Sequence, residues 1–177
     1  MQKIHDQQFD IFIPSGEIQK RVREIAHQIN HDYKDKNPLF LSILNGAFIF
    51  TADLFREITI PAEVSFIKLK SYRKMETSGK VKELLGLENN IFDRNIIIIE
   101  DIVDTGKTLH HVLEEFKELG TRSISILTLL HKPEAARVKL DLSYVGFEIP
   151  NDFVVGYGLD YDGYGRNLKD IYKVVSL

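Results

Sequence analysis

The residues best suited to chemistry lie together in the segment from Ile96 to Leu109, which reads IIIIEDIVDTGKTL. Two adjacent carboxylates, Glu100 and Asp101, follow four isoleucines, and Asp104 precedes the polar residues 105–108. An apolar run of this kind is typical of a central parallel strand. The amphipathic stretch that follows predicts a helix, whose N-terminus attracts anions through unpaired N–H groups and the helix dipole. The segment therefore predicts a phosphate site beside a pair of carboxylates.

The Gly-Lys-Thr triplet at 106–108 raises the alternative of a P-loop nucleotide-binding protein. That motif requires a glycine five residues before Gly106, and Asp101 stands there instead. A second alternative is an ordinary strand-loop-helix corner with exposed acids. Ligands bind at the carboxyl ends of parallel strands, which favours a functional site over this second alternative.

Strands and helices alternate through the middle of the chain, which predicts an α/β fold with a central, mostly parallel sheet flanked by helices. A helix is expected to begin at Ser15, which can cap it, because apolar residues recur at helical spacing as far as Ile29. Further helices are expected at 47–58 and 109–119, the second ending before Gly120. Strands are expected at 39–44, 64–69, 95–100, 123–130, 145–149 and 153–156.

The two ends of the chain fit this alternation poorly. We expect a single domain, 1–177, with a core of about 36–150 and a small hood formed by about 1–35 and 150–177 over the ligand edge of the sheet. Residues 70–82, KSYRKMETSGKVK, are polar and basic. Such a composition is typical of a functional loop or an exposed hairpin.

Composition excludes several classes of protein. The 177 residues include no cysteine, so disulfides, thiolate zinc sites and a cysteine nucleophile are absent. Lys and Arg number 23 against 26 Asp and Glu, and a net charge of −3 disfavours nucleic acid and anionic membranes as partners. Neither a signal peptide nor a membrane-spanning run is recognisable, so we expect a cytoplasmic protein.

Residues 100–108, EDIVDTGKT, resemble the phosphoribosyl-pyrophosphate signature of the type I phosphoribosyltransferases. From about Leu39 to Tyr172 the chain resembles the hypoxanthine–guanine phosphoribosyltransferases of that family. The matching segments are LNGA (44–47), KSY (70–72), LLHK (129–132), VGFEIP (145–150), FVVGY (153–157), LDY (159–161) and Arg166. Agreement of several motifs in order is more specific than the signature alone.

This resemblance implies a purine-salvage enzyme. Phosphoribosyl would pass from 5-phosphoribosyl 1-pyrophosphate to N9 of hypoxanthine, and we expect guanine as well, giving IMP or GMP and pyrophosphate. Positioning and fixed charge suffice for such a reaction, because no protein nucleophile is required. The alternative is a nucleotide-sensing, RNA-binding regulator of the same fold; the net charge and the presence of Tyr72, Asp104 and Lys132 favour catalysis.

The resemblance also implies roles for the residues around the signature. Glu100 and Asp101 would accept hydrogen bonds from the ribose hydroxyls, and Asp104 would be the general base that takes the proton from purine N7. An alternative role for Asp104 is to cap the helix. The residues implied for the 5′-phosphate are Asp104, Thr105, Gly106, Lys107 and Thr108.

The purine and the pyrophosphate would be bound by residues from later segments. Lys132 would donate to the 6-oxo group, which favours 6-oxopurines over adenine, and Phe153 would stack on the base. The purine set is Lys132, Phe153, Val154 and Asp160; the pyrophosphate set is Asn45, Gly46 and Arg166; and Ser71 and Tyr72 would belong to a lid. Without the resemblance, Lys132 reads as a solvated charge and Phe153 as core.

A strongly anionic substrate next to acids implies a bridging Mg²⁺, which prefers carboxylates and substrate phosphates as ligands. Glu100, Asp101 and Asp160 are the candidate carboxylates. Asn45 departs from the family pattern, because many relatives carry lysine there, so backbone groups of Gly46 and Ala47 are the better candidates. The partners expected are small molecules and further copies of the chain, since relatives are dimers or tetramers.

Overall fold

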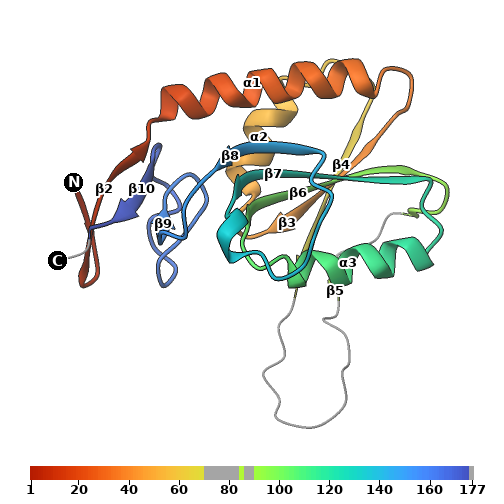
Figure 1. Cartoon of the computed structure of the whole chain (residues 1–177). Coiled ribbons are helices and arrows are strands. Elements are labelled where there is room, and N and C mark those ends of the chain that lie inside the picture. The colour runs from red at the N-terminus through yellow and green to blue at the C-terminus, as the bar shows by residue number, and fades with distance from the viewer. Residues whose placement is uncertain (70–83, 86–89, 176–177) are drawn as a thin grey trace, which may run out of the picture.

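The structure is a computed structural model that describes residues 1–69, 84–85 and 90–175. Its central sheet has the strand order β5-β4-β3-β6-β7-β8 (Figure 1). From β4 to β8 all neighbours are parallel, whereas β5 runs antiparallel to β4. The strands are β3 (Leu39–Leu44), β4 (Glu63–Leu69), β5 (Leu84–Leu85), β6 (Asn95–Val103), β7 (Ser123–His131) and β8 (Tyr144–Glu148). The expected α/β fold class is confirmed.

Helices cover both faces of this sheet, which explains the run of isoleucines. Helices α1 (Ser15–Asp32) and α2 (Phe48–Arg56) lie on one face, and α3 (Lys107–Glu118) lies on the other (Figure 1). Ile97 and Ile99 pack in the cluster of α1 and α2, whereas Ile96 and Ile98 pack in the cluster of α3. Successive strand residues point to opposite faces, so a strand covered on both sides must be apolar throughout. None of the helices in the described ranges has the length and apolar character needed to cross a membrane.

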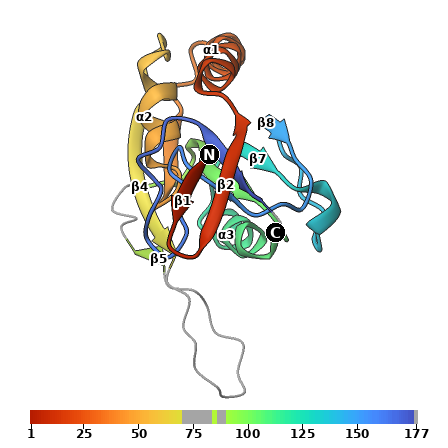
Figure 2. The same cartoon turned by 90° about the vertical axis from the view of Figure 1, so that its left-hand side faces the viewer.

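The two ends of the chain meet in a second, antiparallel sheet of order β1-β2-β10-β9 (Figure 2). Its strands are β1 (Gln2–Ile4), β2 (Gln7–Ile13), β9 (Val154–Val155) and β10 (Ile171–Val174). Helix α1 shares one apolar cluster with Ile97 and Ile99 of the central sheet and with Ile13 and Ile171 of the second sheet. The loop that follows β9 reaches the carboxyl end of β3. Its Gly158 lies against Gly46, two residues after that strand ends.

Two local expectations were wrong. Strand β6 does not end at Glu100, because parallel pairing with β7 continues to Val103, so the acidic pair lies inside the strand. Ser15 does not cap α1: the N-cap residue is Pro14, which has no side-chain cap. Instead, the Ser15 N–H donates to Asp170 Oδ1 at 2.7 Å, so the cap comes from the other end of the chain.

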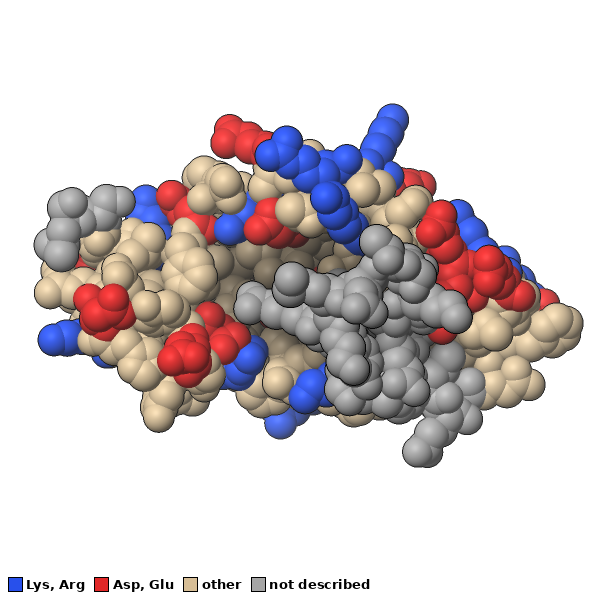
Figure 3. All heavy atoms as spheres, turned by 90° about the horizontal axis from the view of Figure 1, so that it is seen from below, with Lys and Arg blue, Asp and Glu red and all other residues tan. Residues whose placement is uncertain are grey.

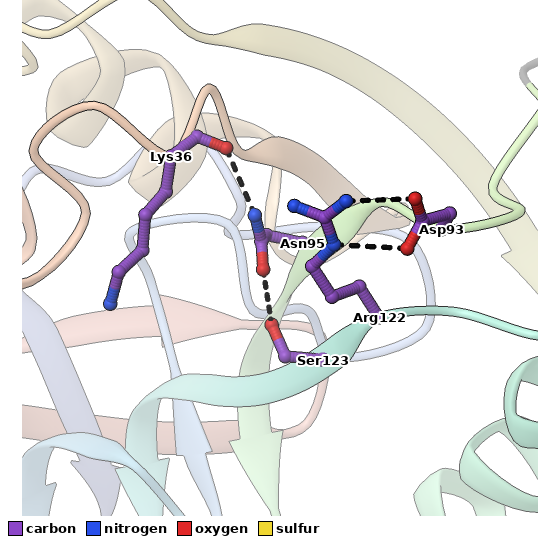
Figure 4. A network of polar contacts seen from close by, with 5 residues as sticks. All are labelled: Lys36, Asp93, Asn95, Arg122 and Ser123. Carbon is purple, nitrogen blue, oxygen red and sulfur yellow. Dashed lines mark hydrogen bonds and ion pairs between the residues drawn. The ribbon is translucent and has the colours of Figure 1, made fainter.

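The amino ends of β6 and β7 are joined by polar contacts (Figure 4). The Asn95 amide donates to the Lys36 carbonyl at 3.0 Å and accepts from the Ser123 hydroxyl at 2.8 Å. The Arg122 guanidinium donates to both carboxylate oxygens of Asp93, at 2.9 and 2.7 Å, and lowers the pKa of that carboxyl. These contacts hold the strands together at the edge opposite to the candidate site.

Candidate active site

A cavity of about 180 Å³ lies where β6 ends and α3 begins. Glu100, Ile102 and Val103 line it from the strand, and Asp104, Thr105, Gly106, Thr108 and Leu109 line it from the loop and the helix. The first turn of a helix leaves N–H groups without intrahelical partners, so the cavity combines a carboxylate with an anion-attracting helix end. Lys107 is exposed and does not line it.

The loop at this helix end is shaped by Gly106, the N-cap residue of α3, whose φ of +76° favours glycine. A Cβ at Gly106 would lie 3.2 Å from the Val138 carbonyl oxygen. The Thr105 carbonyl accepts the N–H groups of Arg137 and Val138 at 3.0 and 3.3 Å. The loop is therefore held from behind by 137–138, which leaves its other side to the cavity.

The Asp104 carboxylate takes part in no interaction with the described residues. No side chain caps α3, so the capping role considered for Asp104 is not observed. The side chain is exposed, and within the described part of the chain it forms no hydrogen bond or ion pair. The carboxylate is thus available to a ligand in the cavity that it lines.

Glu100 and Asp101 interact with one another and with the backbone. The Asp101 N–H donates to Glu100 Oε1 at 3.2 Å, and the Ile102 N–H donates to Asp101 Oδ1 at 2.8 Å. Burial raises the pKa of Glu100 well above its usual range, and the neighbouring Asp101 charge adds to the effect. Asp101 also touches the segment after β3, because a Cβ on Gly46 would overlap its carboxylate. Two crowded carboxylates at a ligand edge fit a cationic partner.

Lys132 follows β7 and is only 7% exposed. Its N–H donates to the Val103 carbonyl at 2.9 Å, which fixes the residue beside the end of β6. Among the described residues, its ammonium has no hydrogen bond or ion pair. The residue is largely enclosed and its ammonium has no acceptor among the described residues, so a ligand oxygen could supply one.

Phe153 precedes β9 and is 46% exposed, so it is not a core residue. Its ring contacts Tyr161 edge-on, with centroids 5.6 Å apart and an angle of 78° between the planes. Val154, the next residue, is buried in the main core cluster. The exposed ring is therefore carried on an anchored backbone.

The remaining candidates meet in the segment 156–166. Arg166 Nη2 pairs with Asp160 Oδ1 at 2.6 Å, and Arg166 Nη1 donates to the Gly158 carbonyl at 2.7 Å. Asp160 Oδ2 accepts the Gly163 N–H at 2.7 Å. Gly158 lies against Gly46, since a Cβ on Gly158 would overlap the Gly46 carbonyl oxygen. The pyrophosphate candidates Gly46 and Arg166 are thus brought together.

Two of the candidates, Ser71 and Tyr72, lie outside the described residues, and Asn45 and the histidines of α3 are at or near the surface. Asn45 is exposed and follows a cis peptide bond. His110 and His111 lie on α3 and pair with Glu114 at 3.3 and 3.8 Å, as surface residues do.

The donor set for a divalent cation is incomplete in the protein alone. Within the described ranges, no group of three or more His, Asp or Glu side chains could hold a metal ion. Glu100 and Asp101 supply two carboxylates, whereas Asp160 is paired with Arg166. Mg²⁺ usually takes one or two carboxylates and completes its shell with water and substrate phosphates, so the acidic pair fits this ion only together with a phosphorylated substrate.

Sequence reasoning missed two contributions to the site. Ile102 lines the cavity. Since β6 extends to Val103, residues two apart share a face, and the position of Ile102 two residues after Glu100 was the available signal. Sequence reasoning assigns no role to Gly158, although its contact with Gly46 joins the two loops. That contact depends on tertiary structure and has no local signal.

Surface charge on one face agrees with the composition. In the view of Figure 3, basic and acidic side chains are interspersed over the described surface, and no continuous basic stripe is visible. Proteins that bind nucleic acid carry such a stripe or patch. This face gives no support to an RNA-binding regulator.

Comparisons with known proteins agree with the geometry. Residues 14–162 match the family model described as phosphoribosyl transferase domain. Hypoxanthine phosphoribosyltransferase of Buchnera aphidicola is 44% identical over 168 residues, which cover 93% of this chain and 95% of that protein. Hypoxanthine-guanine phosphoribosyltransferase of Bacillus subtilis is 42% identical, covering 91% and 90%.

A solved structure is similar over its whole length. The crystal structure of a hypoxanthine-guanine phosphoribosyltransferase from Bacillus anthracis has a TM-score of 0.87 and 40% identity, and the alignment covers 96% of this chain and 99% of that one. A hypoxanthine phosphoribosyltransferase from Staphylococcus aureus has a TM-score of 0.88 and 34% identity, covering 96% and 92%. The chain therefore belongs to the phosphoribosyl transferase domain family.

Proposed function

We propose that this chain is a purine-salvage enzyme that transfers phosphoribosyl from 5-phosphoribosyl 1-pyrophosphate to N9 of hypoxanthine and of guanine. The observation that carries this proposal is the cavity that Glu100 and the start of α3 share. A ribose 5-phosphate bound there would have its phosphate at the helix end and its hydroxyls near a carboxylate. The names of the relatives support the same reaction.

The protein side of this reaction consists of charges fixed before the substrate arrives. As pyrophosphate leaves, positive charge develops on the ribose, and the Glu100–Asp101 pair would stabilise it; the support is that Glu100 lines the cavity. Asp104, whose carboxylate has no other partner in the described part, takes the proton from purine N7. Thr105, Gly106 and Thr108 hold the 5′-phosphate.

Base selection follows from Lys132. Its ammonium, which has no partner among the described residues, donates to the 6-oxo group of hypoxanthine or guanine. Adenine presents a donor at that position, which would leave the ammonium unpaired and cost affinity. Phe153 offers its exposed ring for stacking. Val154 and Asp160 are the further candidates for the purine.

Pyrophosphate and metal complete the proposal. Gly46 and Arg166 bind the leaving group, because a planar guanidinium suits phosphate oxygens, and the Asn45 side chain adds no charge. Glu100 and Asp101, with Asp160 as a further candidate, hold a Mg²⁺ ion together with substrate oxygens. When bound, this ion supplies charge neutralisation for the departing pyrophosphate.

We also propose a homodimer or homotetramer. The support is an apolar groove of about 210 Å³ between α2 and β4, lined by Phe55, Val64 and Phe66 among others. Val64 and Phe66 are 37% and 43% exposed. Sedimentation velocity measures the state directly, and a monomer at micromolar concentration would contradict this part.

The function is tested by following nucleotide formation from 5-phosphoribosyl 1-pyrophosphate and each purine base. Conversion of hypoxanthine and guanine with little conversion of adenine is the expected result. Ribose 5-phosphate, which lacks the leaving group, is the matched negative control. Absence of turnover with every 6-oxopurine would contradict the proposal.

A further inference from the structure

A polar cluster outside the cavity joins both helices of one sheet face to the segment 156–166. Asp53 Oδ2, on α2, accepts the Tyr157 hydroxyl at 2.7 Å and the Gln19 side-chain amide, on α1, at 2.6 Å. The cluster borders a cavity of about 340 Å³ between the helices and residues 167–169. None of the roles considered above uses these side chains.

Tyr157 is a rigid part of the segment that carries Arg166. Its side chain is only 3% exposed, and its φ of +49° is unusual for a residue other than glycine. Its N–H donates to the Leu168 carbonyl at 2.8 Å. Burial, and then the bond to Asp53, raises the pKa of Tyr157, so its hydroxyl remains a donor.

The next residue, Gly158, joins the cluster to the candidate pyrophosphate groups. Its carbonyl accepts from Arg166 Nη1 at 2.7 Å, and its N–H donates to the Arg166 carbonyl at 2.9 Å. Its α-carbon lies against the Gly46 carbonyl. Any rotation of the chain at Tyr157 therefore shifts Gly158 and Arg166 relative to Gly46.

Helix α2 closes a ring through these contacts. It begins at Phe48, two residues after Gly46, and Ala47 is its N-cap residue, so Asp53 is connected to Gly46 by the first turns of the helix. The path runs from Gly46 along α2 to Asp53, through the hydroxyl to Tyr157, and back through Gly158 to Gly46. A closed ring of this kind fixes the separation of the two loops.

We propose that Asp53, acting through the Tyr157 hydroxyl, is a positioning residue that sets Arg166 against Gly46 and so prepares the pyrophosphate side of the site. This inference rests on the proposed function. We expect a larger effect on pyrophosphate binding than on purine binding, because Val154 is held independently by its pairing with Lys173 in the second sheet.

The test is Tyr157→Phe, which removes only the hydroxyl. Asp53 keeps its bond from Gln19, so the fold should be retained. The matched control is Tyr144→Phe, which removes a similar bond of 2.8 Å to Asp32, the last residue of α1, whereas Gln19 lies near the start of that helix. Both variants lose one tyrosine–carboxylate hydrogen bond, but only the first belongs to the ring.

Calorimetric titration with 5-phosphoribosyl 1-pyrophosphate and Mg²⁺ should show a Kd about tenfold higher for Tyr157→Phe, as expected when one hydrogen bond to a charged group no longer prepares the site. The KM for hypoxanthine should rise less. Tyr144→Phe should leave the Kd within about twofold of wild type by the same reasoning. Equal Kd values for the two variants would overturn the inference. The proposed function would still stand if the wild-type protein formed nucleotide.

Hydrogen–deuterium exchange gives a readout that needs no turnover. Peptides covering 157–166 and 45–51 should exchange faster in Tyr157→Phe and not in Tyr144→Phe. If the wild type formed no nucleotide, the proposed function would fail, and this exchange pattern would still decide the inference. Unchanged exchange in both segments would overturn it.

Discussion

Replacing Gly46 by alanine perturbs the contact on which the acidic pair and the pyrophosphate loop both depend. The added Cβ would overlap the Asp101 carboxylate. That carboxylate cannot move away freely, because its Oδ1 accepts the Ile102 N–H at 2.8 Å. Gly46 cannot retreat either, since Gly158 lies against its carbonyl. One of the two loops must therefore shift.

Overpacking of this kind costs about 1–3 kcal/mol. For a domain of this size, a cost of about 2 kcal/mol lowers Tm by roughly 4–8 °C. The shift also separates Gly46 from Arg166, so we expect the Kd for 5-phosphoribosyl 1-pyrophosphate to rise at least tenfold. Thermal denaturation and calorimetric titration measure the two effects.

Gly16→Ala is the matched control. A Cβ at Gly16 meets nothing within 4 Å, and the residue lies in α1. Alanine is favoured over glycine in a helix by about 0.5–1 kcal/mol, so this variant should keep or gain stability and bind normally. In a double variant, adding Asp101→Ala to Gly46→Ala should recover part of the lost stability, because it removes the clashing carboxylate. Wild-type Tm and wild-type affinity in Gly46→Ala would refute this reasoning.

Three further predictions concern single side chains. Asp104→Asn should lower kcat by about 10²–10⁴-fold, the usual contribution of a general base, with little change in the Kd for 5-phosphoribosyl 1-pyrophosphate; an unchanged kcat would remove Asp104 from proton transfer. Lys132→Ala should raise the KM for hypoxanthine and reduce discrimination against adenine in competition assays, and undiminished discrimination would reject its contact with the 6-oxo group. Asp170→Asn should destabilise the fold by about 1 kcal/mol near neutral pH through the weakened cap on α1. The Ser15 N–H holds the pKa of Asp170 below its usual value, so this contribution is present above about pH 4 and is lost as the pH falls through the lowered pKa; urea titrations at pH 7 and pH 3 should therefore differ, and an equal difference from wild type at both would contradict the cap.

The parallel sheet could be predicted because its signals are local. The isoleucine run of β6 is apolar on both faces, and the structure places its residues alternately under α1 and α2 and under α3. Gly120 follows the C-cap residue of α3 with a φ of +74°, as a helix-ending glycine does. Periodicity and turn chemistry report such features directly.

The second sheet was not predictable in detail because it joins residues far apart in the chain. Strand β2 pairs with β10, so its partner lies at the opposite end of the sequence. The cap of α1 by Asp170 and the contact of Gly158 with Gly46 have the same character. Strand β1, with only the three residues Gln2–Ile4, carries too few residues for a period to be read.

The candidate site could be predicted as a set of residues, but its internal contacts could not. The signature 100–108 and the lysine at 132 were identifiable from residue type and order. That Lys132 is buried without a partner among the described residues, and that Asp160 is already paired with Arg166, emerged only from the structure.

The most direct test of the central claim is a crystal structure of the protein with inosine monophosphate. We predict that the 5′-phosphate lies against the backbone N–H groups of 105–108, with the ribose hydroxyls at Glu100 and Asp101 and the 6-oxo group at the Lys132 ammonium. A nucleotide bound elsewhere, with the start of α3 left to solvent, would contradict the account.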